Sequence, residues 1–181
     1  RAFLNKSLMD HIERTNNVKI HFEHSLENID MNNSELIFKN SKKISFNRVM
    51  GSDGSSSCLR KFINERSSMN LRKKPLGHGY KELSIPATKN GDFKIDPEAL
   101  HIWPRGEFML IALPNIDRSF TCTLFFPMEG ETSFSSISSS DQIHELFNSY
   151  FSDTLDLIPD LVEEYQQNPV GSLATVFCNK F

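Results

Sequence analysis

The segment RVMGSDGSSSCLR, residues 48–60, contains the residues whose types and spacing are best suited to bind a phosphate or a ribose. Gly51 and Gly54 allow close backbone approach or a positive φ, and the serines that follow can cap a helix whose free N–H groups face an anion. Asp53 could accept a hydrogen bond from a ligand hydroxyl or fix the amides of its own loop. Because Asp-Gly is also an ordinary turn sequence, the binding and the purely structural interpretation both stay open.

The histidines and cysteines show no spacing typical of a catalytic or metal-binding site. His21 and His24 are expected on a strand, where they would point to opposite faces, which argues against joint metal ligation. His78, in the sequence GHGY, has no carboxylate or cysteine partner at a recognisable spacing. The three cysteines are far apart in the chain, which favours a reducing compartment over disulfides or a zinc site. We therefore predict no catalytic side chain and no metal site.

The stretch FMLIALP, residues 108–114, is apolar on both faces of the strand that it predicts. Alternation places two sets of side chains on opposite faces: Phe108, Leu110 and Ala112 on one, and Met109, Ile111 and Leu113 on the other. One face can pack within the domain, whereas the second must meet helices, another domain or a ligand.

Composition excludes several classes of partner. The chain has 181 residues, of which 38% are hydrophobic and 24% charged, as in a soluble globular protein of one domain or slightly more. The net charge of −3 and the pI of about 6.1 give no reason to expect nucleic acid or an anionic membrane as partner. No apolar run approaches the roughly 18–20 residues that span a bilayer. Fifteen Phe, against one Trp and three Tyr, favour a dry interior.

The first part of the chain predicts an incomplete α/β unit. Leu4, Leu8 and Ile12 at four-residue steps indicate an amphipathic helix. Three strands and a helix are expected after it: VKIHF (18–22), ELIFK (35–39), KISFNRVM (43–50) and the helix CLRKFINER (58–66). A basic stretch, residues 66–74, is interpreted as a solvated loop that leads into a second region.

The second region predicts a mostly antiparallel sheet followed by helices. Turn sequences rich in Gly, Asn, Asp and Pro separate its first four strands. The expected strands are YKELSIP (80–86), ALHIWPR (99–105), FMLIALP (108–114) and FTCTLFFPM (120–128). Two helices, within 141–151 and 155–167, and a last strand, SLATVFC (172–178), complete the region. The expected fold class is therefore α+β or α/β, with a boundary between residues 1–65 and 66–181.

Three blocks of this second region closely resemble the kynurenine 3-monooxygenase family of FAD- and NADPH-dependent aromatic hydroxylases. They are GHGYKELSIP, NGDFKIDPEALHIWPRGEFMLIALPN and SFTCTLFFPME, which together cover about fifty residues and occur in the same order and at the same spacing. The segments RAFLNKSL and GSDG resemble it more loosely, and Ser52 stands where the wider class usually has Ala or Cys. The resemblance implies a partial Rossmann-like FAD-binding domain in residues 1–65. It also implies a substrate-binding β-sheet domain with helices on one face in residues 66–181.

The resemblance also implies an activity. Such an enzyme hydroxylates L-kynurenine to 3-hydroxykynurenine with O₂, through a flavin C4a-hydroperoxide formed after NADPH reduces FAD, in tryptophan degradation and NAD biosynthesis. A related hydroxylase of another aromatic acid and a non-catalytic homologue that binds a small molecule are the alternatives. The protein would be cytoplasmic, or on the outer mitochondrial membrane facing the cytosol if a eukaryotic parent has a C-terminal anchor.

The resemblance assigns roles to individual positions. It implies cofactor contacts at Arg1, Leu26, Asp53 and Gly54. It implies a kynurenine pocket lined by Leu100, Met109, Ile111, Leu113 and Phe125. The G-x-G-x-x-G and G-D-A-A-H segments of the class, and the Arg and Tyr that bind the substrate carboxylate, are not found in this sequence. We therefore expect an internal segment of a longer protein.

Overall fold

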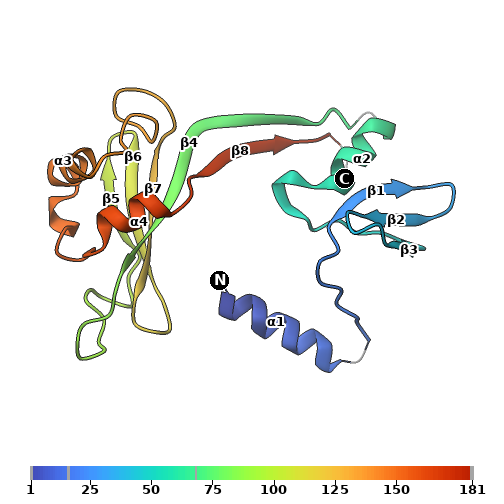
Figure 1. The fold of residues 1–181 in the computed structure, drawn as a ribbon, viewed down its shortest axis with the longest axis horizontal. Coiled ribbons are helices and arrows are strands. Elements are labelled where there is room, and N and C mark those ends of the chain that lie inside the picture. Colours follow the sequence, from blue (N-terminus) through green and yellow to red (C-terminus); the bar gives the residue numbers. More distant parts are fainter. Residues whose placement is uncertain (1, 16, 68, 180–181) are drawn as a thin grey trace. The chain divides into compact units, whose positions relative to one another are not determined.

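The computed structural model describes residues 2–15, 17–67 and 69–179 (Figure 1). The chain divides into two compact units: a first unit, Arg1–Arg72 with Phe177–Phe181, and a second unit, Lys73–Val176. Among the described residues, no helix has the length and apolar character needed to cross a membrane.

The first unit contains a small antiparallel sheet and two α-helices. Its elements are α1 (Ala2–Arg14), β1 (Leu26–Asp30), β2 (Glu35–Phe38), β3 (Lys43–Ser45), the 3₁₀ turn η1 (Gly54–Ser56) and α2 (Cys58–Ser67). The strands follow one another in the order β1-β2-β3, and both neighbouring pairs are antiparallel. Its buried apolar side chains are few: Ile29, Phe38, Phe62 and Met69. A Rossmann-like fold is built on parallel strands. The strand pairs described in this unit are antiparallel, so the expected Rossmann-like domain stays a prediction.

The helix predicted from Leu4, Leu8 and Ile12 is confirmed as α1, but its apolar stripe is not buried. All three side chains are exposed, and so is Phe3 on the same helix. Periodicity therefore predicted the helix correctly, whereas the partner that such a stripe requires is not provided by the described residues.

The prediction of a strand at VKIHF is wrong, because residues 18–25 form turns and irregular structure. The first strand of the sheet lies further on, at β1, where Leu26 pairs with Phe38 and Asp30 with Glu35. Glu23 has a φ of 58°, which ends any extended run through this segment. The alternation of Val18, Ile20 and Phe22 has no neighbouring strand to pair with, so it does not produce a strand.

The second unit is built on a five-stranded sheet in the order β5-β6-β7-β4-β8. Its strands are β4 (Arg72–Ile85), β5 (His101–Arg105), β6 (Phe108–Pro114), β7 (Phe120–Pro127) and β8 (Gly171–Phe177). The pairs β5/β6, β6/β7 and β7/β4 are antiparallel, which confirms the predicted character of this sheet. The prediction of a loop over residues 66–74 is wrong in part, because β4 begins at Arg72, eight residues before the expected start.

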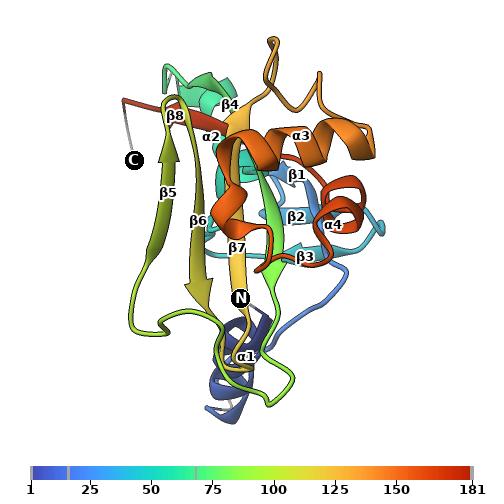
Figure 2. The same ribbon diagram turned by 90° about the vertical axis from the view of Figure 1, so that its left-hand side faces the viewer.

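Helices cover one face of this sheet, as predicted (Figure 2). They are α3 (Ser140–Tyr150), the 3₁₀ turn η2 (Ser152–Thr154) and α4 (Leu161–Gln167). Ser139 and Gln142 form a capping box at the start of α3. The core between helices and sheet contains Leu83, Leu110, Leu124, Phe126, Ile143, Phe147 and Phe151, among others. We call the sheet face toward these helices the inner face and the opposite one the outer face.

Lys81 is a charged residue on the buried inner face. Its Nζ donates hydrogen bonds to the carbonyl oxygens of Tyr165 (2.5 Å) and Asn168 (2.6 Å), at the C-terminal end of α4. It also lies 4.8 Å from the centroid of the Tyr165 ring. Burial lowers the pKa of Lys81. The cation offsets part of this desolvation by bonding the last carbonyls of the helix, where positive charge is favoured.

Candidate functional site

The outer face consists of side chains that the strand register places in rows across the sheet. Directly paired residues of antiparallel strands point to the same face. The first row contains Pro104, Met109, Phe125 and Tyr80. The second contains Ile102, Ile111, Thr123 and Glu82, and the third contains Leu113, Thr121 and Ser84. The outer face is thus apolar over β5 and β6 and more polar over β7 and β4.

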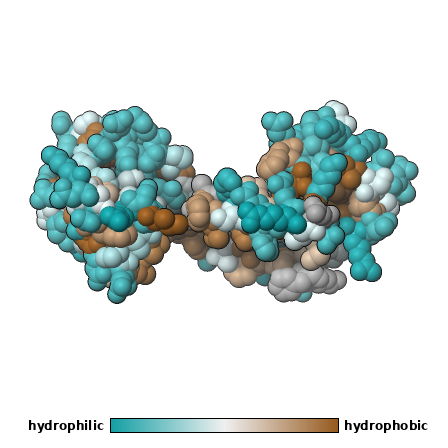
Figure 3. Space-filling view, turned by 90° about the horizontal axis from the view of Figure 1, so that it is seen from below, coloured by the Kyte–Doolittle hydropathy of each residue, from teal (hydrophilic) through white to brown (hydrophobic). Residues whose placement is uncertain are grey.

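The predicted division of FMLIALP between two faces is confirmed. Leu110 and Ala112 point to the inner face and are fully buried, with 0% exposure. On the outer face, Met109 is 37% and Leu113 48% exposed. The helices of the second unit therefore seal one side of β6 and leave the other side uncovered. In Figure 3 the second unit is the left-hand lobe, and brown apolar residues lie among its teal polar ones.

All five residues expected to line an aromatic pocket belong to the same region of the sheet. Met109, Ile111, Leu113 and Phe125 share the outer face, and Leu100 comes immediately before β5 with its side chain exposed. The structure therefore brings together positions up to 25 residues apart in the sequence. That they bind a substrate stays a prediction.

Two of the expected cofactor contacts line one groove in the first unit. This groove has a volume of about 620 Å³ and is lined by residues that include His24, Leu26, Lys39, Gly51, Ser52, Asp53 and Cys58. It therefore contains Leu26 and Asp53. Gly54 is not among its lining residues, but its φ of +75° and the open space around its Cα fulfil the expected use of a glycine. Arg1 lies outside the described residues.

Asp53 fixes the amides of its own loop, which was one of the two alternatives. Its carboxylate accepts a hydrogen bond of 2.8 Å from the backbone N–H of Cys58, the first residue of α2. The hydrogen bond from the Ser57 side chain, followed by backbone N–H groups at the start of α2, holds the pKa of Asp53 below its usual value. Arg60 completes the turn by donating to the carbonyl oxygens of Gly54 and Ser55.

Replacing Asp53 with alanine is expected to lower the free energy of unfolding by about 0.5–1 kcal/mol at pH 7, the low end for a helix cap because the carboxylate is exposed. The folded pKa lies below the unfolded value of about 3.9, so this contribution is present above that value and lost as the pH falls through the folded pKa. Thermal unfolding of the wild-type protein and of Asp53→Ala, at pH 7 and at pH 2.5, measures this contribution. The difference should shrink at the lower pH, whereas Asp156→Ala, an exposed carboxylate without a hydrogen bond among the described residues, should show little effect at either pH.

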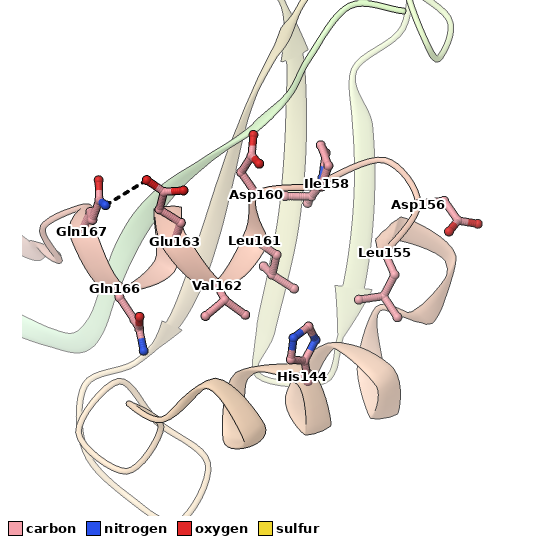
Figure 4. A pocket seen from close by; sticks show the side chains of 11 residues that line it. His144, Leu155, Asp156, Ile158, Asp160, Leu161, Val162, Glu163, Gln166 and Gln167 are labelled. Carbon is pink, nitrogen blue, oxygen red and sulfur yellow. Dashed lines mark hydrogen bonds between the residues drawn. The ribbon is translucent and has the colours of Figure 1, made fainter.

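A separate cavity of about 680 Å³ lies among the helices of the second unit (Figure 4). His144 of α3 lines it together with acidic and amide side chains: Asp156, Asp160, Glu163, Gln166 and Gln167. Gln167 bonds Glu163 at 3.0 Å, and the described residues offer no hydrogen bond that orients His144. None of the predicted site residues lies there, and the cavity has no paired acid and base. We therefore take the outer face of the second unit and the groove of the first unit as two separate candidate sites.

The histidines differ from expectation in one respect. His21 and His24 do not lie on opposite faces of a strand, because no strand forms there, and their ring centroids are 5.2 Å apart. Across the described ranges, no group of three His, Cys, Asp or Glu side chains is placed to hold a metal ion. Nε2 of His78 lies 3.0 Å from the carbonyl oxygen of Glu107, which ties β4 to the β5–β6 turn.

The cysteines are free thiols, and Cys122 is buried in the core. Burial raises the pKa of Cys122 to about 12, so its thiol stays protonated and unreactive.

Comparison with curated proteins gives a consistent result. The chain is 44% identical over 177 residues to a kynurenine 3-monooxygenase of Dictyostelium discoideum, covering 97% of this chain and 38% of that protein. It is 41% identical to a kynurenine 3-monooxygenase of Myxococcus xanthus (97% of this chain, 39% of that protein) and 39% identical to one of Flavobacterium psychrophilum (98% and 41%). The chain thus spans about two fifths of the length of these relatives.

Solved structures resemble the fold at low sequence identity. The tetracycline destructase Tet(51) matches with a TM-score of 0.57 and 15% identity, over 92% of this chain and 44% of that one. The flavin-dependent halogenase CmlS matches with a TM-score of 0.50 and 11% identity, over 98% of this chain and 31% of that one. No family model matches the chain. Nearly the whole chain is nevertheless homologous to part of longer proteins named kynurenine 3-monooxygenase, which confirms the resemblance found in the sequence.

Proposed function

We propose that this chain is part of an FAD-dependent monooxygenase that hydroxylates L-kynurenine, and that its outer face forms one wall of the substrate pocket. The observation that carries the proposal is the one-sided cover of β6. The inner side is sealed by the unit's own helices, whereas on the other side Met109 and Leu113 are exposed and Ile111 is half-buried, an apolar surface that these helices do not cover. The homology to named kynurenine 3-monooxygenases supports the choice of an aromatic substrate.

The outer face is suited to hold an aromatic ring rather than to transfer protons. Its apolar half presents Leu, Ile and Met side chains, with Phe125 in the adjoining strand. Burying one side of a ring on such a surface contributes roughly 2–3 kcal/mol at about 25 cal/mol per Å². The apolar wall also keeps water away from the reacting ring. This matters because water would otherwise react with the oxidant before the substrate does.

The groove of the first unit fits part of an FAD. The backbone at Gly54, beside the groove, is open to close approach. Lys39 lines the groove and could offer a positive charge to a phosphate, and Asp53 retains an oxygen that can accept a hydrogen bond from a hydroxyl. Bound FAD, reduced by NADPH, would supply the activation of O₂. Residues of the groove in the first unit would hold part of the FAD, and residues of the outer face in the second unit would contact the substrate ring.

The experiment uses the full-length protein that contains this sequence. We expect the purified protein to show flavin absorbance, and we expect L-kynurenine to increase its NADPH consumption with formation of 3-hydroxykynurenine, identified by mass spectrometry. Another aromatic acid, such as 4-hydroxybenzoate, serves as the comparison substrate.

Stimulation by 4-hydroxybenzoate with hydroxylation of that acid, and no response to kynurenine, would replace the substrate in this proposal. A protein that purifies without flavin and does not bind added FAD would reject the monooxygenase assignment altogether.

A further inference from the structure

Tyr80 continues the apolar row of the outer face toward β8. Its partner on β7 is Phe125, whose partner on β6 is Met109, so the three side chains follow one another across three strands. The ring centroids of Tyr80 and Phe125 are 6.4 Å apart, and the planes are tilted by 47°. Tyr80 is half-buried. Its ring therefore belongs to the same surface as the residues proposed to contact the substrate.

Gly171, the first residue of β8, makes this position of the ring possible. A Cβ atom at residue 171 would lie 2.3 and 2.4 Å from two carbons of the Tyr80 ring and 2.8 Å from its hydroxyl oxygen. Such distances are well inside van der Waals contact, so the ring lies directly on the backbone of β8. Close approach of another group is a recognised reason for a glycine in a strand.

The hydroxyl of Tyr80 lies over β8, 2.8 Å from the position of a Cβ atom at residue 171, at the end of its row where the neighbouring strands of the outer face are more polar. In the next row, Ile102 and Ile111 on β5 and β6 are followed by Thr123 on β7. Within residues 2–15, 17–67 and 69–179, the Tyr80 hydroxyl makes no hydrogen bond, and the aromatic ring beside it is that of Phe125. A phenolic hydroxyl can both donate and accept, so it offers a ligand on this face one directional contact beside an apolar wall.

We propose that Tyr80 is a specificity-determining residue. Its ring continues the wall beneath the aromatic ring of the substrate, its hydroxyl bonds a carbonyl or amine group carried by that substrate, and Gly171 positions it. The inference rests on the proposed function, because it takes the outer face as the substrate wall. It adds a polar contact to a wall that would otherwise recognise only shape and apolar area.

The first test is Tyr80→Phe in the full-length protein, which removes one oxygen atom and keeps the ring. We expect the KM for L-kynurenine to rise about 3- to 10-fold, the usual effect of losing one neutral hydrogen bond, with kcat changed less than about twofold. The dissociation constant of L-kynurenine, measured without turnover by quenching of flavin fluorescence, should rise by the same factor. Tyr150→Phe, on α3, is the matched control and should change neither quantity.

The second test concerns Gly171. Gly171→Ala should displace the Tyr80 ring and weaken kynurenine binding at least as much as Tyr80→Phe. If Gly171→Ala destabilises the protein, the double variant Tyr80→Ala/Gly171→Ala should recover stability, because the three atoms nearest to the added Cβ all belong to the Tyr80 side chain.

The outcomes separate this inference from the proposed function. Binding of kynurenine that weakens in Tyr80→Phe supports the inference even if the wild-type protein does not turn kynurenine over, a result that would reject only the activity. Unchanged kynurenine affinity in Tyr80→Phe overturns the inference while the activity stands. A variant that loses FAD affinity but keeps kynurenine affinity also overturns it, because Tyr80 would then serve the cofactor. Absence of kynurenine binding in the wild type rejects both.

Discussion

Replacing Phe126 with alanine is expected to lower the free energy of unfolding by about 3–5 kcal/mol, the range for a fully buried aromatic side chain. Phe126 has 0% exposure and lies on the inner face of β7. Its ring meets those of Phe108 and Phe134 edge to face, with centroids 5.0 and 5.2 Å away. Truncation removes apolar burial and both ring contacts, and the neighbouring helices restrict any collapse into the cavity. Urea unfolding of the full-length protein, followed by circular dichroism, measures the effect on the transition that reports the second unit.

The matched control for this prediction is Phe22→Ala. Phe22 is exposed in the irregular segment before β1, so its loss should change stability by less than about 0.5 kcal/mol. Equal destabilisation by the two substitutions would contradict the core described for the second unit.

Replacing Phe125, the neighbour of Phe126, should instead affect the reaction. Phe125 points to the outer face beside Met109 and Tyr80, and its removal opens a gap in the wall that we propose for the substrate. We expect Phe125→Ala in the full-length enzyme to reduce kcat/KM for kynurenine by about tenfold, because Phe125 is one of several side chains that share the roughly 2–3 kcal/mol of apolar contact. We also expect a larger fraction of the NADPH consumed to end as hydrogen peroxide, because water enters the gap. NADPH, peroxide and 3-hydroxykynurenine are measured in the same reaction.

Phe177→Ala, at the exposed end of β8, provides the comparison for a lost Phe outside the wall. If the ratio of peroxide to NADPH is the same in Phe125→Ala and in the wild type, Phe125 does not shield the reacting ring.

The second unit was largely predictable because its sequence patterns and its packing agree. In β7, every second residue is buried, as the alternation of Phe120, Cys122, Leu124 and Phe126 requires. Assigning strands from the alternation of apolar residues failed at VKIHF, where the segment has no partner strand. It also failed at the start of β4, where a run of basic residues forms part of a strand although it shows no such alternation. Pairing between strands, rather than local propensity, decides such cases.

The candidate site was predictable only in part. The position of Met109, Ile111 and Leu113 on one uncovered face follows from alternation, but their alignment with Phe125 and Tyr80 depends on a register that no local pattern gives. The role of Gly171 was missed for the same reason, since its neighbour Tyr80 is 91 positions earlier in the chain. Asp53 could be assigned to its own loop only once its hydrogen bond to Cys58 was located.

The uncovered stripe of α1 has a practical consequence for any preparation of this chain by itself. Phe3, Leu4 and Leu8 form an exposed apolar surface on this helix. Exposed apolar surfaces of this kind promote self-association and adsorption. A solubilising fusion partner or a mild non-ionic detergent would shield this apolar surface of α1 in such samples.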